Sequence, residues 1–254
     1  MSAIELETRS LATAPQPFLN KGMQRMCIWT GPVLIALWLV SWVFLARFIP
    51  PPAPSKTPQE IVEFYGERTG SIRLGMVLTV FASALLVPFA GVIAVQMKRI
   101  EGPRAVLANI QLVSAGALSI EFIVPIMFFQ TIAFRLDEES ARMMQMLNDM
   151  GWLIFVAVIS TVIVQVLAIG LAAFIDRREV PIFPRWYGYL SLWVVLLLAP
   201  AGVTAFFKDG PFAWNGLLSF YVPLTSFVIW VGATTVVLLR AVARDSLDEA
   251  PVAR

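Results

Sequence analysis

The residue best suited to chemistry in this chain is a carboxylate inside an apolar stretch. Glu121 is the only charged residue between Ala105 and Phe134. Pro125 follows four residues later, and because proline has no N–H, the carbonyl of residue 121 would lose its helical partner. An acid and an unpaired carbonyl would then lie at one depth of an apolar segment. Such a pair could bind and release a proton, or bond the polar group of an otherwise apolar ligand.

A purely structural role for Glu121 is the alternative. A charge at the centre of a bilayer costs roughly 3 kcal/mol, and no Lys or Arg lies in the interior of any apolar run. We therefore expect hydrogen-bonding side chains around it, either Gln165 or Thr161 of the fourth apolar run, or Thr79 or Ser83 of the second. Such a bond would hold two helices together without any further activity.

The composition excludes several catalytic mechanisms. Histidine is absent from all 254 positions, which removes histidine-ligated metal and haem sites and serine–histidine nucleophiles. The single cysteine, Cys27, cannot form an intrachain disulfide or a dithiol redox pair, and no standard glycine-rich phosphate loop occurs. An intramembrane aspartyl protease needs two acids at membrane depth, and only Glu121 qualifies. We therefore expect no enzymatic activity, no cofactor and no metal site.

The elements that would position Glu121 are membrane helices. Of the residues, 58% are hydrophobic and 14% charged, whereas an average soluble domain has roughly 25% charged residues. A helix of about 20 apolar residues crosses a bilayer. The pattern predicts an all-α polytopic bundle of six transmembrane helices, at about Met26–Phe48, Leu74–Met97, Ala105–Phe134, Gly151–Ile175, Tyr187–Phe207 and Gly216–Leu239.

Charged residues predict the orientation of the bundle. We expect a tail at residues 1–25, a transmembrane domain at 26–240 and a second tail at 241–254. The side that holds both tails carries twelve Lys and Arg residues, and the other side carries seven. Since positive residues are enriched on the cytoplasmic side, we expect a multi-pass protein of the plasma (inner) membrane with both termini in the cytoplasm. The net charge of +2 gives no indication of nucleic acid binding.

Two loops on the opposite side carry helix signals. Residues 57–60 read Thr-Pro-Gln-Glu, a capping box with proline at the first helical position. A short helix on the membrane surface is expected there, as a lid or as a packing cap. Residues 135–150 combine an acidic start with a methionine-rich stripe, which predicts a helical extension that could also dock a partner protein or a hydrophobic ligand.

Two short matches between the halves of the chain indicate a 3+3 inverted repeat. Leu85–Ala94 matches Leu197–Ala205, and Phe122–Phe129 matches Phe220–Phe227, with a proline in every copy. The matched runs would cross in opposite directions, as in transporters that place substrate at broken helices. Ser219 would then be the counterpart of Glu121. The alternative is that the prolines are ordinary kinks whose freed carbonyls find partners on neighbouring helices.

Four segments carry a resemblance to a known group of proteins. They read TPQEIVEFYGERTGSIRLGMVLTVFASALLVPFAGVIAVQMKRIEGP, LNDMGW, FPRWYGYLSLW and GPFAWNGLLSFY. In these segments the chain resembles small bacterial six-helix membrane proteins of unknown function. The resemblance implies the topology only.

The combined pattern favours a non-enzymatic role in the lipid bilayer. We expect the protein to handle or transport a small hydrophobic compound or lipid, with Glu121, Pro125, Gln165 and Ser219 at the site together with the other prolines of the repeat. The alternative is a structural or accessory subunit that contacts other membrane proteins, and a membrane enzyme ranks third. A transporter needs a cavity near Glu121, a scaffold needs none, and an enzyme needs a second reactive group beside the acid.

Overall fold

All regular structure in the described part of the chain is helical. The computed structural model describes residues 21–136 and 139–244. Its elements are α2 (Lys21–Leu39), η1 (Val40–Leu45), α3 (Pro58–Gly66), α4 (Thr69–Ala84), α5 (Leu86–Glu101), α6 (Val106–Phe134), α7 (Ala141–Ala157), α8 (Ser160–Ile175), α9 (Arg185–Leu198), η2 (Ala199–Phe206), η3 (Leu217–Tyr221) and α10 (Val222–Arg244). The predicted fold class, an all-α polytopic bundle, is confirmed.

Six segments of the described chain are long and apolar enough to cross a membrane. Each overlaps one of the predicted runs; they are Lys21–Leu45, Thr69–Glu101, Val106–Phe134, Ala141–Ile175, Arg185–Phe206 and Leu217–Arg244. Helix α2 continues across residue 25 and α10 across residue 240, so both predicted domain boundaries fall inside helices. Most of the two predicted tails, residues 1–20 and 245–254, lies outside the described residues.

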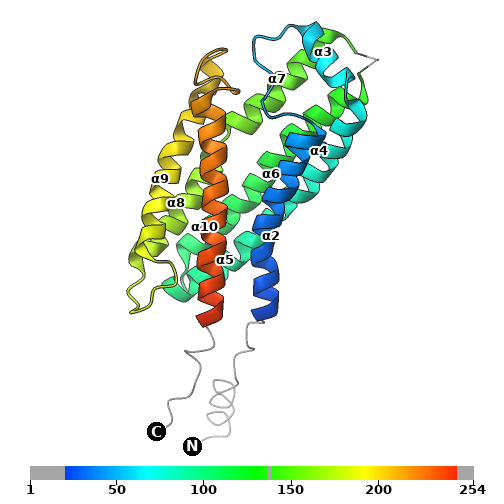
Figure 1. The fold of residues 1–254 in the computed structure, drawn as a ribbon. Coiled ribbons are helices and arrows are strands. Elements are labelled where there is room, and N and C mark those ends of the chain that lie inside the picture. Colours follow the sequence, from blue (N-terminus) through cyan, green and yellow to red (C-terminus); the bar gives the residue numbers. More distant parts are fainter. Residues whose placement is uncertain (1–20, 137–138, 245–254) are drawn as a thin grey trace, which may run out of the picture.

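Helix α6 lies at the centre of the bundle. It packs against α4, α5, α7 and α8, while α2 packs against α5 and α10, and α9 lies against α8 and α10. Figure 1 shows the start of α2 and the end of α10 at the same end of the bundle, with α3 at the opposite end. We call these the Arg244 end and the α3 end. Glu121 is therefore carried by a helix that packs against four other long helices.

The short helix α3 begins at the predicted capping box. Thr57 Oγ1 accepts a hydrogen bond from the Glu60 N–H, and the Glu60 carboxylate accepts one from the Thr57 N–H at 2.7 Å. The bond from this backbone N–H lowers the pKa of Glu60. Ile61 and Tyr65 on the apolar side of α3 are buried, and the Tyr65 hydroxyl lies 3.3 Å from Oδ1 of Asn148 in α7. The apolar side of α3 therefore packs onto α7. The helix therefore covers the bundle as a packing cap rather than presenting this side to lipid.

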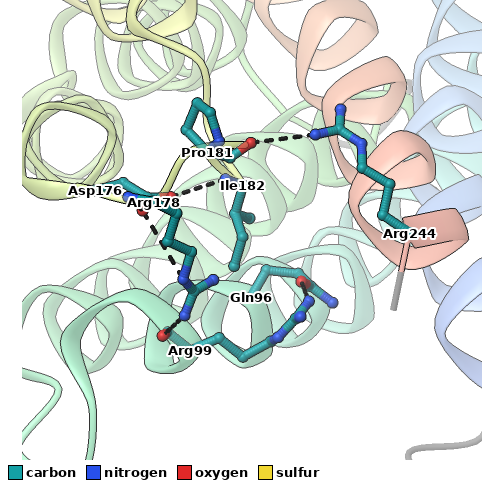
Figure 2. Close-up of polar contacts among 7 residues, drawn as sticks. All are labelled: Gln96, Arg99, Asp176, Arg178, Pro181, Ile182 and Arg244. Atoms are coloured by element: carbon teal, nitrogen blue, oxygen red, sulfur yellow. Dashed lines mark hydrogen bonds and ion pairs between the residues drawn. The ribbon is translucent and has the colours of Figure 1, made fainter. Parts of the chain in front are cut away.

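A loop between α8 and α9 ties the helices together at the Arg244 end (Figure 2). Arg178 Nε lies 4.0 Å from Asp176 Oδ1, and the guanidinium of Arg178 also donates to the carbonyl of Arg99 in the last turn of α5. A cation there faces the negative end of the α5 dipole. Arg244 reaches the same loop from α10 by donating to Pro181 O at 3.4 Å.

The structure does not confirm the inverted repeat. Leu85–Ala94 begins at a turn and continues in α5, whereas Leu197–Ala205 passes into the 3₁₀ helix η2. Phe122–Phe129 lies inside the uninterrupted α6, whereas Phe220–Phe227 begins in the π-helical η3. The matched sequences thus adopt different backbone conformations in the two halves.

Candidate functional site

Glu121 bonds to the fourth span. Thr161 Oγ1 donates a hydrogen bond to Glu121 Oε2, so the observed partner is one of the four that the sequence offered. The two candidates on α4 donate within their own helix, Thr79 to Gly75 O and Ser83 to Thr79 O, both at 2.8 Å. The acid therefore links α6 to α8 and not to α4.

The fourth span is broken next to Thr161. Helices α7 and α8 are separated by Val158 and Ile159. Val158 leaves the helical conformation with φ −83° and ψ 80°, and Ile159 provides no side-chain cap for α8. The first N–H groups of a helix lack partners within it, and their partial positive charge favours a nearby carboxylate. Because Thr161 is the second residue of α8, Glu121 is held at this positive helix end.

Gln165 lies one turn further along α8 than Thr161. Its side chain is fully buried, and within the described ranges neither its amide oxygen nor its amide nitrogen has a hydrogen-bond partner. Residues four apart lie on the same face of a helix, so Gln165 and Thr161 share a face. Leaving a buried amide without partners typically costs 1–3 kcal/mol, an order-of-magnitude range. The predicted polar site therefore contains an amide that the protein itself does not satisfy.

A cavity of about 80 Å³ lies beside the break in the fourth span. Its wall combines residues of α2, α6, the α7–α8 break, the end of α9, η3 and the start of α10. They are Trp38, Leu118, Phe122, Phe155, Val156, Val158, Ile159, Val162, Leu198, Ser219, Phe220, Pro223, Leu224 and Phe227. One water needs roughly 10–15 Å³ of such space, so the cavity has room for a small apolar group.

One helix break and two changes of helix type meet at this cavity. Besides the α7–α8 break, they are the change from α9 to the 3₁₀ helix η2 after Leu198, and the change from the π-helical η3 to α10 after Tyr221. Pro200 and Pro223 are each the second residue of the segment that follows. Proline is favoured near the start of a helix, where no N–H partner is needed. These two prolines therefore mark where segments begin rather than kinks within them.

A second, smaller cavity of about 20 Å³ adjoins the first. It lies between α2 and α10 and shares Trp38, Phe155, Phe220, Leu224 and Phe227 with the larger cavity. It also reaches Leu39, which is 42% exposed. The two cavities thus share one wall, and the smaller one reaches a partly exposed residue of α2.

Two side chains supply the polar groups of the cavity wall. Ser219 Oγ donates to Phe212 O at 2.8 Å, so its hydroxyl hydrogen is already engaged. Trp38 is 7% exposed, and its indole N–H has no partner within residues 21–136 and 139–244. An indole nitrogen can only donate. A ligand that carries a hydrogen-bond acceptor could therefore satisfy Trp38.

Only one of the four predicted site residues lines this cavity. Ser219 lines the cavity, whereas Glu121, Pro125 and Gln165 are absent from its wall. Pro125 is buried in α6, which continues through it without interruption. Glu121 is connected to the cavity indirectly, because Phe122 follows it on α6 and its partner Thr161 precedes the wall residue Val162.

Sequence reasoning missed the α7–α8 break and the unpartnered indole N–H of Trp38. The break contains neither glycine nor proline, and its one local signal is the pair Ser160–Thr161 inside an apolar run, since Ser and Thr favour helix N-termini. Trp38 is one of eight tryptophans and has no distinguishing neighbour in the sequence. Both become visible only through the packing of distant segments.

Neither a metal-binding cluster in the described residues nor a match to a known protein identifies what this arrangement does. Within the part of the chain that the structure describes, no three His, Cys, Asp or Glu side chains gather to hold a metal ion. The chain matches no family model, no curated protein and no solved structure. The geometry of the cavity and its polar groups therefore carries the functional argument.

Proposed function

We propose that this membrane protein binds a small hydrophobic compound in the cavity beside the α7–α8 break and handles or transports it. The observation that carries the proposal is the meeting of one helix break and two changes of helix type at one apolar cavity. Transporters commonly bind substrate at discontinuous membrane helices, where backbone groups are free to contact it. Ligand cavities are also mostly apolar with few polar groups that fix orientation.

Trp38 defines the class of ligand. Its unsatisfied indole N–H calls for an acceptor, and the rings of Phe122 and Phe155 lie 4.5 Å and 5.8 Å from its ring. An apolar molecule with one carbonyl matches such a wall, because the carbonyl accepts the N–H bond while the rest of the molecule contacts aromatic rings. The second cavity provides access from the bilayer between α2 and α10.

Glu121 acts on the cavity through α8 in this proposal. Its carboxylate interacts favourably with the positive end of α8, and a proton on the carboxyl removes that interaction. The protonation state of Glu121 then changes the stability of the α7–α8 break, whose residues Val158 and Ile159 form part of the wall. This arrangement couples a proton to ligand binding without direct contact between Glu121 and the ligand.

An accessory subunit remains the second candidate because of one feature of α7. Met143, Met146 and Met150 are 44%, 55% and 45% exposed near the α3 end. Methionine is common at adaptable binding surfaces. A partner protein that covers these side chains would co-purify with the wild type and be lost on substitution of Met146 by Glu.

We also propose a plasma-membrane location with the Arg244 end in the cytoplasm. Ten described Lys and Arg residues lie at the Arg244 end, namely Lys21, Arg25, Lys98, Arg99, Arg104, Arg177, Arg178, Arg185, Arg240 and Arg244. Seven lie toward the α3 end, namely Arg47, Lys56, Arg68, Arg73, Arg135, Arg142 and Lys208. The larger number of positive residues at the Arg244 end supports the placement of that end in the cytoplasm.

Ligand binding is tested by the melting temperature of the purified protein in nanodiscs. The probes are short-chain methyl ketones, whose size suits the cavity, each compared with its parent hydrocarbon. Binding at 100 times the dissociation constant stabilises a protein by about 2.7 kcal/mol. We expect stabilisation by a ketone in the wild type, a smaller effect in Trp38→Phe, and none in Leu224→Trp, which fills the cavity.

The matched control is Val236→Trp, which adds the same ring to an exposed position of α10 outside the cavity. It should respond to the ketone as the wild type does. Equal stabilisation of all four proteins, or no stabilisation of any, would contradict the proposal. If binding is found, flux of the same ketone into vesicles across a pH gradient should be lost in Glu121→Gln.

A further inference from the structure

A groove between α4 and α6 lies near the α3 end, away from the cavity described above. Its volume is about 460 Å³, and its wall consists of Arg73, Val77, Met127, Gln130, Thr131 and Phe134. Gln130, Thr131 and Phe134 belong to the last turns of α6, and Arg73 to the second turn of α4. The polar residues of the groove therefore gather at the level where a spanning helix meets the lipid headgroups.

The guanidinium of Arg73 is held in place at the top of the groove. Its Nε and Nη2 donate to Ala133 O at 3.0 Å and 2.5 Å. Ala133 is the second-last residue of α6, so its carbonyl has no partner within the helix. Gln130 Nε2 in turn donates to Arg73 O at 3.3 Å. The bonds to Ala133 O hold the Arg73 side chain against α6, whereas the Gln130 bond goes to the Arg73 backbone.

Arg73 keeps unused hydrogen-bonding capacity. A guanidinium has five N–H donors, and two of the nitrogens of Arg73 are directed to one carbonyl. No acidic residue lines the groove, and no described carboxylate forms an ion pair with Arg73. A positive charge fixed at the membrane surface with free donors favours a phosphate, which arginine binds through parallel bonds.

Below Arg73 an apolar track leads toward the middle of the membrane. Val77 and Phe81 continue the same face of α4 at spacings of four residues, and they are 42% and 69% exposed. On α6, Met127, Val124 and Ile120 are 54%, 38% and 61% exposed. From Arg73 to Phe81 the helix rises by about 12 Å at roughly 1.5 Å per residue. This length suits the upper part of an acyl chain.

We propose that this groove binds one phospholipid molecule, with the phosphate on Arg73 and Gln130 and an acyl chain along Val77 and Met127. The site is independent of the cavity beside the α7–α8 break. It differs from general lipid contact because a fixed guanidinium, polar α6 residues and an apolar track are aligned in one groove. Without the lipid, the remaining N–H groups of Arg73 would hydrogen-bond to water at the membrane surface.

The test is lipid retention measured by native mass spectrometry. The protein is reconstituted into nanodiscs of a neutral galactolipid with a small fraction of dioleoylphosphatidylglycerol, and then released into mild detergent. We expect one phosphatidylglycerol to remain bound to the wild type. In Arg73→Gln its affinity should fall by about tenfold, which corresponds to about 1.4 kcal/mol. Dioleoylglycerol has the same tails without the phosphate and should not be retained.

Two matched controls keep the result interpretable. Arg142→Gln removes a positive charge from an exposed residue of α7 at the same end of the bundle, and it should retain the lipid. Val77→Trp fills the groove but leaves Arg73 in place, whereas Val113→Trp changes a 73% exposed position of α6 outside the groove. Only Val77→Trp should lose the lipid. Equal retention by all variants, or equal retention of dioleoylglycerol, would overturn the proposal.

Discussion

At the scale of single residues, Glu121 shows how an acid is placed inside a membrane bundle without a cation. Its partner is a threonine on the first turn of α8, and the free N–H groups of that turn provide a partial positive charge. A continuous fourth span would offer only the hydroxyl. The break after α7 therefore stabilises the acid on α6, and the acid stabilises the break. Neither Glu121 nor the residues at the break indicate this pairing in the sequence.

Tyr65 gives a prediction at the same scale. Burial, and secondarily the charge of Asp149, raise the pKa of Tyr65 well above 10. A raised pKa in the folded state means that stability is retained below pH 10 and lost as the pH rises above the pKa of the unfolded chain. The free energy of unfolding of the wild type should fall relative to Tyr65→Phe by about 1 kcal/mol between pH 10 and 11.

Unfolding in mixed detergent micelles at a series of pH values measures this difference. At pH 8, Tyr65→Phe should be less stable than the wild type by about 1 kcal/mol, because the hydrogen bond to Asn148 is lost. The two curves should approach each other above pH 10. Curves that stay parallel up to pH 11 would show that the Tyr65 hydroxyl reaches water in the folded protein.

At the scale of elements, hydropathy predicted the spans well but not their interruptions. An apolar run of about 20 residues is sufficient to specify a membrane helix, and the six runs were found on this basis. The prolines were poor guides to breaks, since α6 continues through Pro125 while the fourth span breaks at Val158 without any proline. Neighbouring helices can satisfy freed backbone groups, so packing decides where a break occurs.

Helix contacts also depend on glycine at one crossing of α6 and α7. A Cβ added to Gly151 would overlap the ring of Phe129, which is fully buried in an aromatic cluster with Trp42 and Trp152. Overpacking of a core typically costs about 1–3 kcal/mol. We expect Gly151→Ala to lower the free energy of unfolding by this amount.

The matched substitution on α10 should not lower the free energy of unfolding. Nothing lies within 4 Å of a Cβ added to Gly232, and alanine is favoured over glycine inside a helix by up to about 1 kcal/mol. Gly232→Ala should thus leave stability unchanged or increase it, as measured by the same unfolding titration. A loss of similar size in both variants would show that α7 and α10 tolerate alanine equally poorly, and that the Phe129 contact is not the cause.

At the scale of the whole molecule, charge and packing divide the bundle into two unlike ends. The Arg244 end carries most of the positive residues, and two of them, Arg178 and Arg244, also bond the loop after α8 to α5 and α10. The α3 end carries the packing cap α3 and the lipid groove at Arg73. The proposed orientation would therefore place the phospholipid site in the outer leaflet and the loop after α8 in the cytoplasm.

Labelling of single cysteines tests this orientation in intact cells. The chain has one cysteine, Cys27, which can be replaced by serine to give a cysteine-free background. Ser55 precedes α3 and Glu179 follows α8, and both are exposed. Because positive residues are retained on the cytoplasmic side, Ser55→Cys should react with a membrane-impermeant maleimide in intact cells, and Glu179→Cys only after lysis. The reverse pattern would put the Arg244 end outside, and with it the Arg73 groove in the inner leaflet.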